Sequence, residues 1–175
     1  SQASTLIIDW AYPGIVGSGV CMHPFGATRP PRLALGLGLA GLIPFVTGAL
    51  GLWLTPEAWR DRVLEELLAY AAIILAFMGA IHWGLAMRAE ENSDKAPVQL
   101  GLSVIPPLLG WVALALPNVL GLPVILVAFA ALYFADIWAV NHGVAPVWYP
   151  ALRKPLTIIV VCSLLVAWLA TLVVG

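Results

Sequence analysis

Five long apolar runs separated by short polar connections are the feature of this sequence that most limits its fold. Each run has about the 17 to 25 residues that a helix needs to cross the hydrocarbon core of a bilayer. Of the 175 residues, 62% are hydrophobic and only 10% are charged, whereas about a quarter of the residues in a soluble domain are charged. The pattern excludes an ordinary soluble domain and predicts an all-α integral membrane bundle of about five transmembrane helices.

Prolines and clustered charges mark the ends of the expected membrane spans. The spans lie within a membrane domain over residues 32–175, at about residues 33–54, 67–87, 100–116, 119–140 and 156–174. The charged residues 57–66 and the polar residues 141–155 are expected to connect spans. An apolar and aromatic arm, residues 1–31, precedes the domain. Its Trp10 and Tyr12 are expected to lie at the membrane interface or against a partner.

The distribution of Lys and Arg between the two sides of a five-helix bundle predicts its orientation. The side of the N-terminus would hold most of the basic residues, namely Arg29, Arg32, Arg88, Lys95, Arg153 and Lys154. Only Arg60 and Arg62 would lie on the other side. Because basic loops stay preferentially in the cytoplasm, the N-terminus is predicted to be cytoplasmic and the C-terminus to be outside.

Asp136 is the one charged residue inside an expected span, which makes it the first candidate for a functional residue. An ionisable side chain inside a membrane is unfavourable, so it normally faces the bundle interior and has a partner. His82 is the candidate partner, because both residues lie a few positions before the cytoplasmic ends of their spans and therefore at the same depth. Equal depth alone does not decide whether the two side chains touch.

Aromatic residues gather at the depth of this pair. With His82 and Asp136 as polar contacts, Trp83, Tyr133 and Trp138 would form the walls of a site for a quinone, pigment or lipid. The alternative is structural, since interhelical polar pairs often only hold helices together and tryptophans ordinarily form an interfacial belt. A second group of residues is expected to serve partner contacts or structure: Tyr70, Trp148, Tyr149 and Arg153, with Trp10 and Tyr12 of the arm.

Motifs for catalysis and for metal or nucleic-acid binding are missing from the sequence. It contains no HExxH zinc motif, no glycine-rich phosphate loop and no nucleophile motif. Haem held by two histidines would need a second histidine in a span, and only His82 lies in one. Transport would need more polar residues in the bilayer, although Asp136 leaves a small proton-coupled transporter as an alternative. The sequence predicts no enzyme, no metal site, no nucleic-acid partner, and no cofactor beyond a quinone, pigment or lipid.

Two segments resemble the signature of a known family. They are residues 70–84, which end in His82-Trp83-Gly84, and residues 146–157, which contain Trp148-Tyr149, Leu152-Arg153 and Leu156-Thr157. Both are similar to the bacterial domain of unknown function number 3429, a family that also includes mitochondrial transmembrane protein 69. The resemblance covers about residues 32–175 and implies a small inner-membrane protein of several helices. It supplies no agreed activity and no established catalytic residues to carry over. Residues 1–31 are longer than the family leads one to expect.

These observations together predict an accessory or assembly subunit of a larger inner-membrane complex, respiratory or photosynthetic. Every helix must present an apolar surface, and the glycines of the first span let another helix approach closely. The expected partners are therefore membrane lipids and the subunits of that complex. A bacterial inner membrane, crossed several times, is favoured over a mitochondrial one because the sequence shows no Arg-rich transit peptide.

Overall fold

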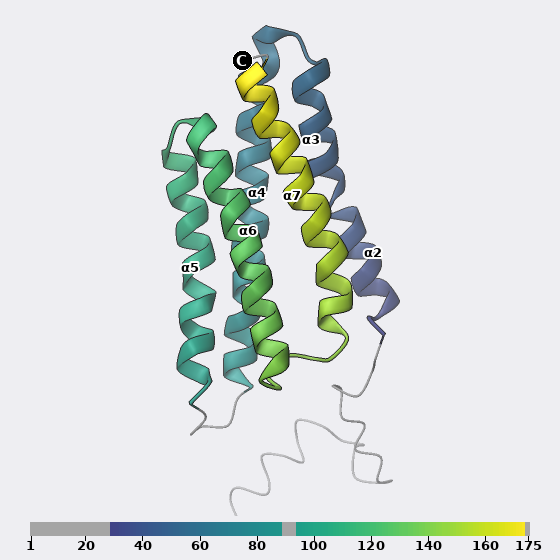
Figure 1. Ribbon diagram of the computed structural model, residues 1–175, viewed down its shortest axis with the longest axis vertical. Helices are drawn as coiled ribbons and strands as arrows, with labels where there is room; N and C mark the ends of the chain where they lie inside the picture. The colour runs from purple at the N-terminus through teal and green to yellow at the C-terminus, as the bar shows by residue number, and fades with distance from the viewer. Residues whose placement is uncertain (1–28, 89–93, 174–175) are drawn as a thin grey trace, which may run out of the picture.

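Figure 1 shows the computed structural model of the chain, which describes residues 29–88 and 94–173. All regular structure in these two ranges is helical. The helices are α2 (Arg32–Ala40), α3 (Ile43–Leu54), α4 (Glu57–Met87), α5 (Ala96–Ala115), α6 (Asn118–Asn141) and α7 (Tyr149–Val173). With α2 and α3 counted as one span, 5 helices are long and apolar enough to cross a membrane. The predicted all-α fold with five such helices is confirmed.

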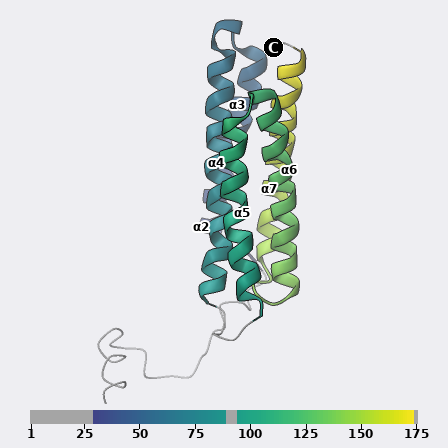
Figure 2. The same cartoon turned by 90° about the vertical axis from the view of Figure 1, so that its left-hand side faces the viewer.

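The spans run alternately in opposite directions and lie side by side in one elongated bundle (Figures 1 and 2). α4 packs most extensively against α5, α6 packs against α7, and α3 packs against both α7 and α4. α2 lies at the edge of the bundle, where its main neighbour is α7. We call the end of the bundle that holds His82 and Asp136 the polar end; α4 and α6 end there, and α2, α5 and α7 begin there.

The first span, which the sequence presents as one run, is broken into α2 and α3 at Gly41 and Leu42. Pro44 explains the break, because it has no N–H group for the carbonyl of Ala40 and is tolerated only in the first turn of the next helix. The Tyr70 hydroxyl of α4 donates a hydrogen bond of 3.0 Å to the carbonyl oxygen of Gly41. A side chain thus satisfies backbone that the break exposes, as a lipid environment requires.

Two segments that were expected to be connections are helical instead. Residues 57–66 form the first turns of α4, and residues 149–155 form the first turns of α7. On α4, the guanidinium of Arg62 pairs with Glu66 one turn later at 2.6 Å, with both side chains exposed. The loop expected over residues 149–155 was wrong, whereas residues 57–66 still connect two spans as the start of a helix. Charged side chains disfavour the bilayer, not the helix, and a charged pair at this spacing supports a helix in water.

Prolines inside the spans are tolerated because neighbouring helices accommodate them. α6 continues through Pro123, which cannot donate to the carbonyl of Val119 one turn earlier. The indole Nε1 of Trp168 on α7 donates to that carbonyl at 3.0 Å and so replaces the missing bond. On α5, Pro106 packs against α4 at Gly79, where a Cβ would lie 3.1 Å from the proline ring.

The hydrophobic core lies between the spans along most of the bundle. Phe45 of α3 and Phe129 of α6 are among its largest buried side chains, and their rings meet edge-on with centroids 5.9 Å apart. In the described ranges, the buried side chains of the Asp, Glu, Lys, Arg and His types are His82, Asp136 and Arg153. All three lie at the polar end, so buried charge is confined to one level of the bundle.

Candidate functional site

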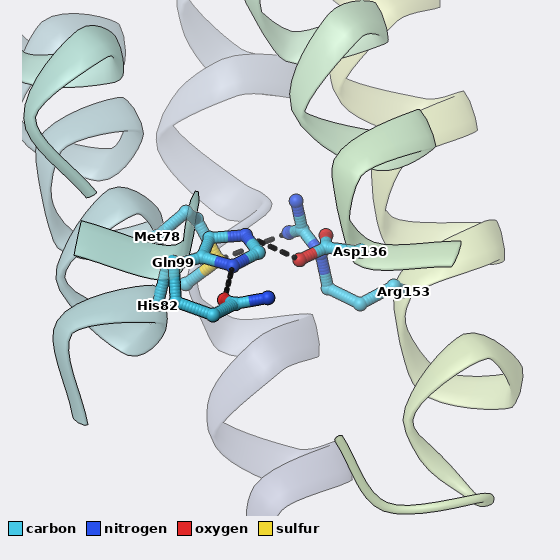
Figure 3. A network of polar contacts seen from close by, with 5 residues as sticks. All are labelled: Met78, His82, Gln99, Asp136 and Arg153. Atoms are coloured by element: carbon cyan, nitrogen blue, oxygen red, sulfur yellow. Dashed lines mark hydrogen bonds and ion pairs between the residues drawn. The ribbon is translucent and has the colours of Figure 1, made fainter. Parts of the chain in front are cut away.

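Asp136 and His82, which the sequence placed at one depth, meet in the interior of the bundle (Figure 3). His82 projects from α4 and is 0% exposed, and Asp136 projects from α6 and is 2% exposed. The imidazole Nε2 lies 3.2 Å from Asp136 Oδ1, within ion-pair distance but without the alignment of a hydrogen bond. The pair therefore joins α4 to α6 away from water and lipid.

Arg153 is the principal partner of Asp136. Its Nε donates a hydrogen bond of 2.6 Å to Asp136 Oδ2, and its Nη1 lies 2.9 Å from the sulfur of Met78 on α4. The sequence placed Arg153 among partner or structural residues in a connection. Because that segment is the beginning of α7, the guanidinium points into the bundle, where it is 4% exposed. Charge-assisted bonds of this kind are the strongest hydrogen bonds in proteins.

Gln99 completes the network and was missed in the sequence. It lies near the start of α5, is 0% exposed, and its side-chain Oε1 is 2.5 Å from His82 Nδ1. The signal that could have found it is an uncharged amide in an otherwise apolar run, on the side of the membrane where His82 was expected. With Gln99 the network connects α4, α5, α6 and α7 at one level (Figure 3).

The contacts of His82 restrict where the protons of the network lie. A lone pair on Nε2 would face the carboxylate oxygen of Asp136, so a proton on Nε2 is favoured. With its Oε1 toward the ring, the Gln99 amide accepts from Nδ1, and after a 180° turn of that amide its nitrogen donates to Nδ1 instead. Either arrangement links the imidazole on α4 to α5.

The network joins four helices through contacts between buried side chains. Both carboxylate oxygens of Asp136 face a partner, one on α4 and one on α7. Replacing one member alone would leave a buried charge or dipole without its partner, which is far less favourable than replacing both. In the described part of the chain, no three His, Cys, Asp or Glu side chains are grouped so that they could hold a metal ion.

The aromatic residues expected around the pair lie outside this network. Trp83 is 49% exposed on α4. Tyr133 is half-buried and its ring lies beside Phe134. Trp138 is half-buried, and its ring lies 4.4 Å from that of His142, with the two planes tilted by 31°. The structure thus brings His82 and Asp136 together and leaves the three expected walls elsewhere.

The residues expected to serve structure or partners are spread over two places. Tyr70 lies at the break between α2 and α3, where its ring also meets Phe45 edge-on. Trp148 and Tyr149 lie at the polar end where α7 begins, with Tyr149 buried and Trp148 half-buried. Trp10 and Tyr12 lie outside the described residues.

Residues 30–169 match the model of the DUF3429 family, whose description is "Protein of unknown function". This chain belongs to the DUF3429 family. The match includes His82, Gln99, Asp136 and Arg153, and it confirms the resemblance seen in the sequence. The family description assigns no activity, so the role of the network must be argued from its geometry.

The relatives of this DUF3429 chain are membrane proteins. Transmembrane protein 69 of Xenopus tropicalis is 37% identical over 139 residues, which are 77% of this chain and 53% of that protein. Transmembrane protein 69 of Mus musculus is 28% identical over 138 residues, which are 78% of this chain and 55% of that protein. The chain spans about half the length of these relatives. No solved structure matches it significantly. The DUF3429 chain is thus a multi-pass membrane protein.

Proposed function

We propose that this DUF3429 protein is a non-enzymatic accessory or assembly subunit of a larger inner-membrane complex. The observation that carries the proposal is the exposure of α2. None of the residues of α2 is buried, and Leu33 and Leu37 are 75% and 66% exposed. The span made of α2 and α3 has the smallest buried share of the five spans. A helix attached so lightly to its own bundle has most of its surface left for another subunit.

An apolar helix face is stable in lipid, so exposure alone does not require a partner. The small residues of α2 supply the second argument. A Cβ on Gly36 would have nothing within 4 Å, so the backbone there is open to close approach. Small residues with an accessible backbone are where transmembrane helices associate. After Arg32, α2 consists only of Leu, Ala and Gly, so the occupant of this face is an apolar transmembrane helix of another subunit.

The polar network supports the non-enzymatic part of the proposal. Asp136 is engaged with His82 and Arg153 inside the bundle, which leaves its carboxylate no open side for a substrate. The contribution of these residues is a fixed arrangement of α4, α5, α6 and α7. A rigid bundle with one lightly attached helix suits a subunit that stabilises or helps to assemble its partners.

The orientation and the membrane are part of the same proposal. Arg29, Arg32, Arg88, Lys95 and Lys154 lie at the polar end or in its connections, whereas Arg60 and Arg62 lie at the other end. By the preference of basic loops for the cytoplasm, the polar end faces the cytoplasm. A bacterial inner membrane, with a respiratory or photosynthetic electron-transport complex as the partner, is the setting that we propose.

Mild-detergent extraction of the native membrane, followed by size separation and mass spectrometry, tests the proposal. Co-migration with a large complex is the expected result, and an absorption spectrum of the same fraction identifies electron-transport partners. Gly36→Leu is expected to release the protein from the complex. Gly101→Leu is the matched control, because Gly101 also has nothing within 4 Å but lies on α5, a helix packed extensively against α4. A native protein that migrates alone would contradict the proposal.

A further inference from the structure

A cavity of about 360 Å³ lies between α2, α3, α4 and α7, beside the polar network. Its size falls in the range of sites for small molecules, which begins at roughly 300 Å³. Most of its lining is apolar and includes Gly38, Phe45, Ile74 and Met78. Leu37 of α2 and Phe77 of α4 also line it and are more than 60% exposed. The cavity therefore opens to the lipid between α2 and α4.

Three polar residues of α7 line one side of this cavity: Tyr149, Arg153 and Thr157. They are four residues apart, so they share one helix face and rise by about 6 Å per step. All three are more than nine-tenths buried. Arg153 Nη2 and Thr157 Oγ1 nevertheless have no hydrogen-bond partner within the protein, and the Tyr149 hydroxyl lies near Asp136 without the alignment of a good hydrogen bond. Buried polar atoms almost always have a partner, so two unpartnered donors and one poorly bonded hydroxyl beside an apolar cavity indicate that a bound molecule supplies it.

The charge balance beside the cavity indicates the kind of head group. Arg153 already has a counter-ion, because its Nε donates to Asp136 at 2.6 Å. A ligand carrying a carboxylate or phosphate would compete with Asp136 for the guanidinium. An uncharged acceptor leaves the pair intact and can accept from Nη2 of Arg153 and from one neighbouring hydroxyl, that of Tyr149 or that of Thr157. A carbonyl oxygen is the acceptor that an apolar molecule can bring into the bilayer.

We propose that this cavity binds an uncharged, carbonyl-bearing lipophile, held by the row of Tyr149, Arg153 and Thr157, with its apolar body extending between α2 and α4. Such a carbonyl can belong to the ring of a membrane quinone or to the ester of a neutral lipid. The site is distinct from the one expected in the sequence, since Trp83, Tyr133 and Trp138 do not line it. It does not depend on the accessory-subunit role, because it is argued only from walls that belong to this chain.

Probe binding to the full chain in detergent micelles tests the site. Native mass spectrometry with decylubiquinone and with dioctanoylglycerol distinguishes the two sources of the carbonyl, and decanoate serves as the anionic probe of similar chain length. Saturable binding of one molecule of decylubiquinone or of dioctanoylglycerol is expected. Two variants leave the side chains of Arg153 and Asp136 unchanged: Tyr149→Phe, which removes a hydroxyl group, and Thr157→Val, which replaces a hydroxyl by a methyl group.

Combining these two substitutions is expected to weaken probe binding about tenfold, because the hydrogen bond from the neighbouring hydroxyl is lost. Ala34→Phe, which fills the α2 side of the cavity, is expected to abolish binding. Thr171→Val is the matched control, because its hydroxyl bonds to the carbonyl of Trp168 on its own helix, away from the cavity.

The thermal midpoint of each variant is measured in the same micelles, so that lost binding is separated from lost folding. Three results would overturn the proposal: no saturable binding of either carbonyl probe, preference for decanoate, or equal binding by the combined variant and the parent chain. Weaker binding at an unchanged or higher midpoint supports it, because a purely structural hydroxyl would lower the midpoint when removed.

Discussion

The α4–α5 seam and the α2–α7 seam both contain glycine, but the glycines allow close backbone contact only in the α4–α5 seam. Between α4 and α5, a Cβ on Gly79 would lie 3.0 Å from the carbonyl oxygen of Ser103, and a Cβ on Gly110 would lie 3.3 Å from Ala72. Between α2 and α7, a Cβ on Gly38 would meet only the side chain of Leu156. The first seam is closed backbone to backbone, whereas at the second seam glycine meets a movable side chain beside a cavity.

The difference shows that glycine fixes the distance between helices only where the opposite helix is also small or fixed. Pro106 and the backbone of Ser103 cannot move away from Gly79, whereas the end of a leucine side chain can move away from Gly38. The polar network also connects the two helices of the closed seam, because His82 lies on α4 and Gln99 on α5. The bundle thus has a locked side, α4 to α7, and an open side at α2.

Asp136→Leu should break the locked side and have the largest effect. It leaves the buried charge of Arg153 without its counter-ion, which is expected to lower the free energy of unfolding by about 3–5 kcal/mol. Unfolding of the purified protein by titration of SDS into mixed micelles measures the loss. A cavity-side change, such as Ala34→Phe, is expected to leave this value nearly unchanged.

The double variant Asp136→Leu/Arg153→Met separates the ion pair from other effects of the leucine. Because both charges are then removed together, it should recover most of the lost stability. A double variant as unstable as Asp136→Leu would show that the pair does not lock the helices.

Gly79→Leu should force the α4–α5 seam apart. Its side chain would collide with the backbone of Ser103 and with Pro106, and overpacking of this kind lowers the free energy of unfolding by about 1–3 kcal/mol. The same SDS titration measures the change. Gly101→Leu on α5 is the control, because Gly101 faces open space and its substitution should be tolerated. Similar losses in both variants would mean that helix propensity, and not the seam, decides the outcome.

Gln99→Leu should weaken the network without removing a charge. A hydrogen bond between membrane helices contributes about 0.6 kcal/mol on average, so a loss below about 2 kcal/mol is expected. The nitrogen chemical shifts of His82, measured by NMR on labelled protein, should also change, since Nδ1 loses its partner. Ser103→Ala is the control, because that hydroxyl bonds to the carbonyl of Leu100 on its own helix. Unchanged His82 shifts would contradict the contact.

The membrane helices and the pairing of His82 with Asp136 were predictable from the sequence. Long apolar runs without charged residues identify membrane spans directly, and a lone carboxylate inside such a run requires a partner at the same depth. The position of Arg153 was not predictable in the same way. It belongs to a segment rich in charge and proline, and only the packing of α7 shows that this segment is helical and turned inward.

Gln99 and the cavity escaped prediction for different reasons. An amide gives no charge signal, and a single polar residue in an apolar run is equally compatible with a helix end. The cavity depends on how α2 lies beside α4 and α7 after the break in the first span. The sequence pattern around Pro44 can indicate the break between α2 and α3, but it does not determine how far α2 then lies from its neighbours. The open side of the bundle is therefore seen only in the three-dimensional structure.

Gly36→Ala and Gly38→Ala test the open side and should have the smallest effects. A Cβ at position 36 meets nothing, so Gly36→Ala is expected to stabilise α2 by up to about 1 kcal/mol through helix propensity alone. At position 38 the new Cβ would lie 2.8 Å from Leu156 Cδ1, which can turn away, so the gain should be smaller or absent. Hydrogen exchange of the α2 amides in micelles measures both changes. If Gly36→Ala instead loosened α2 as strongly as Gly79→Leu loosens α4 and α5, the first span would be packed as tightly as the rest, and the distinction between a locked and an open side would fail.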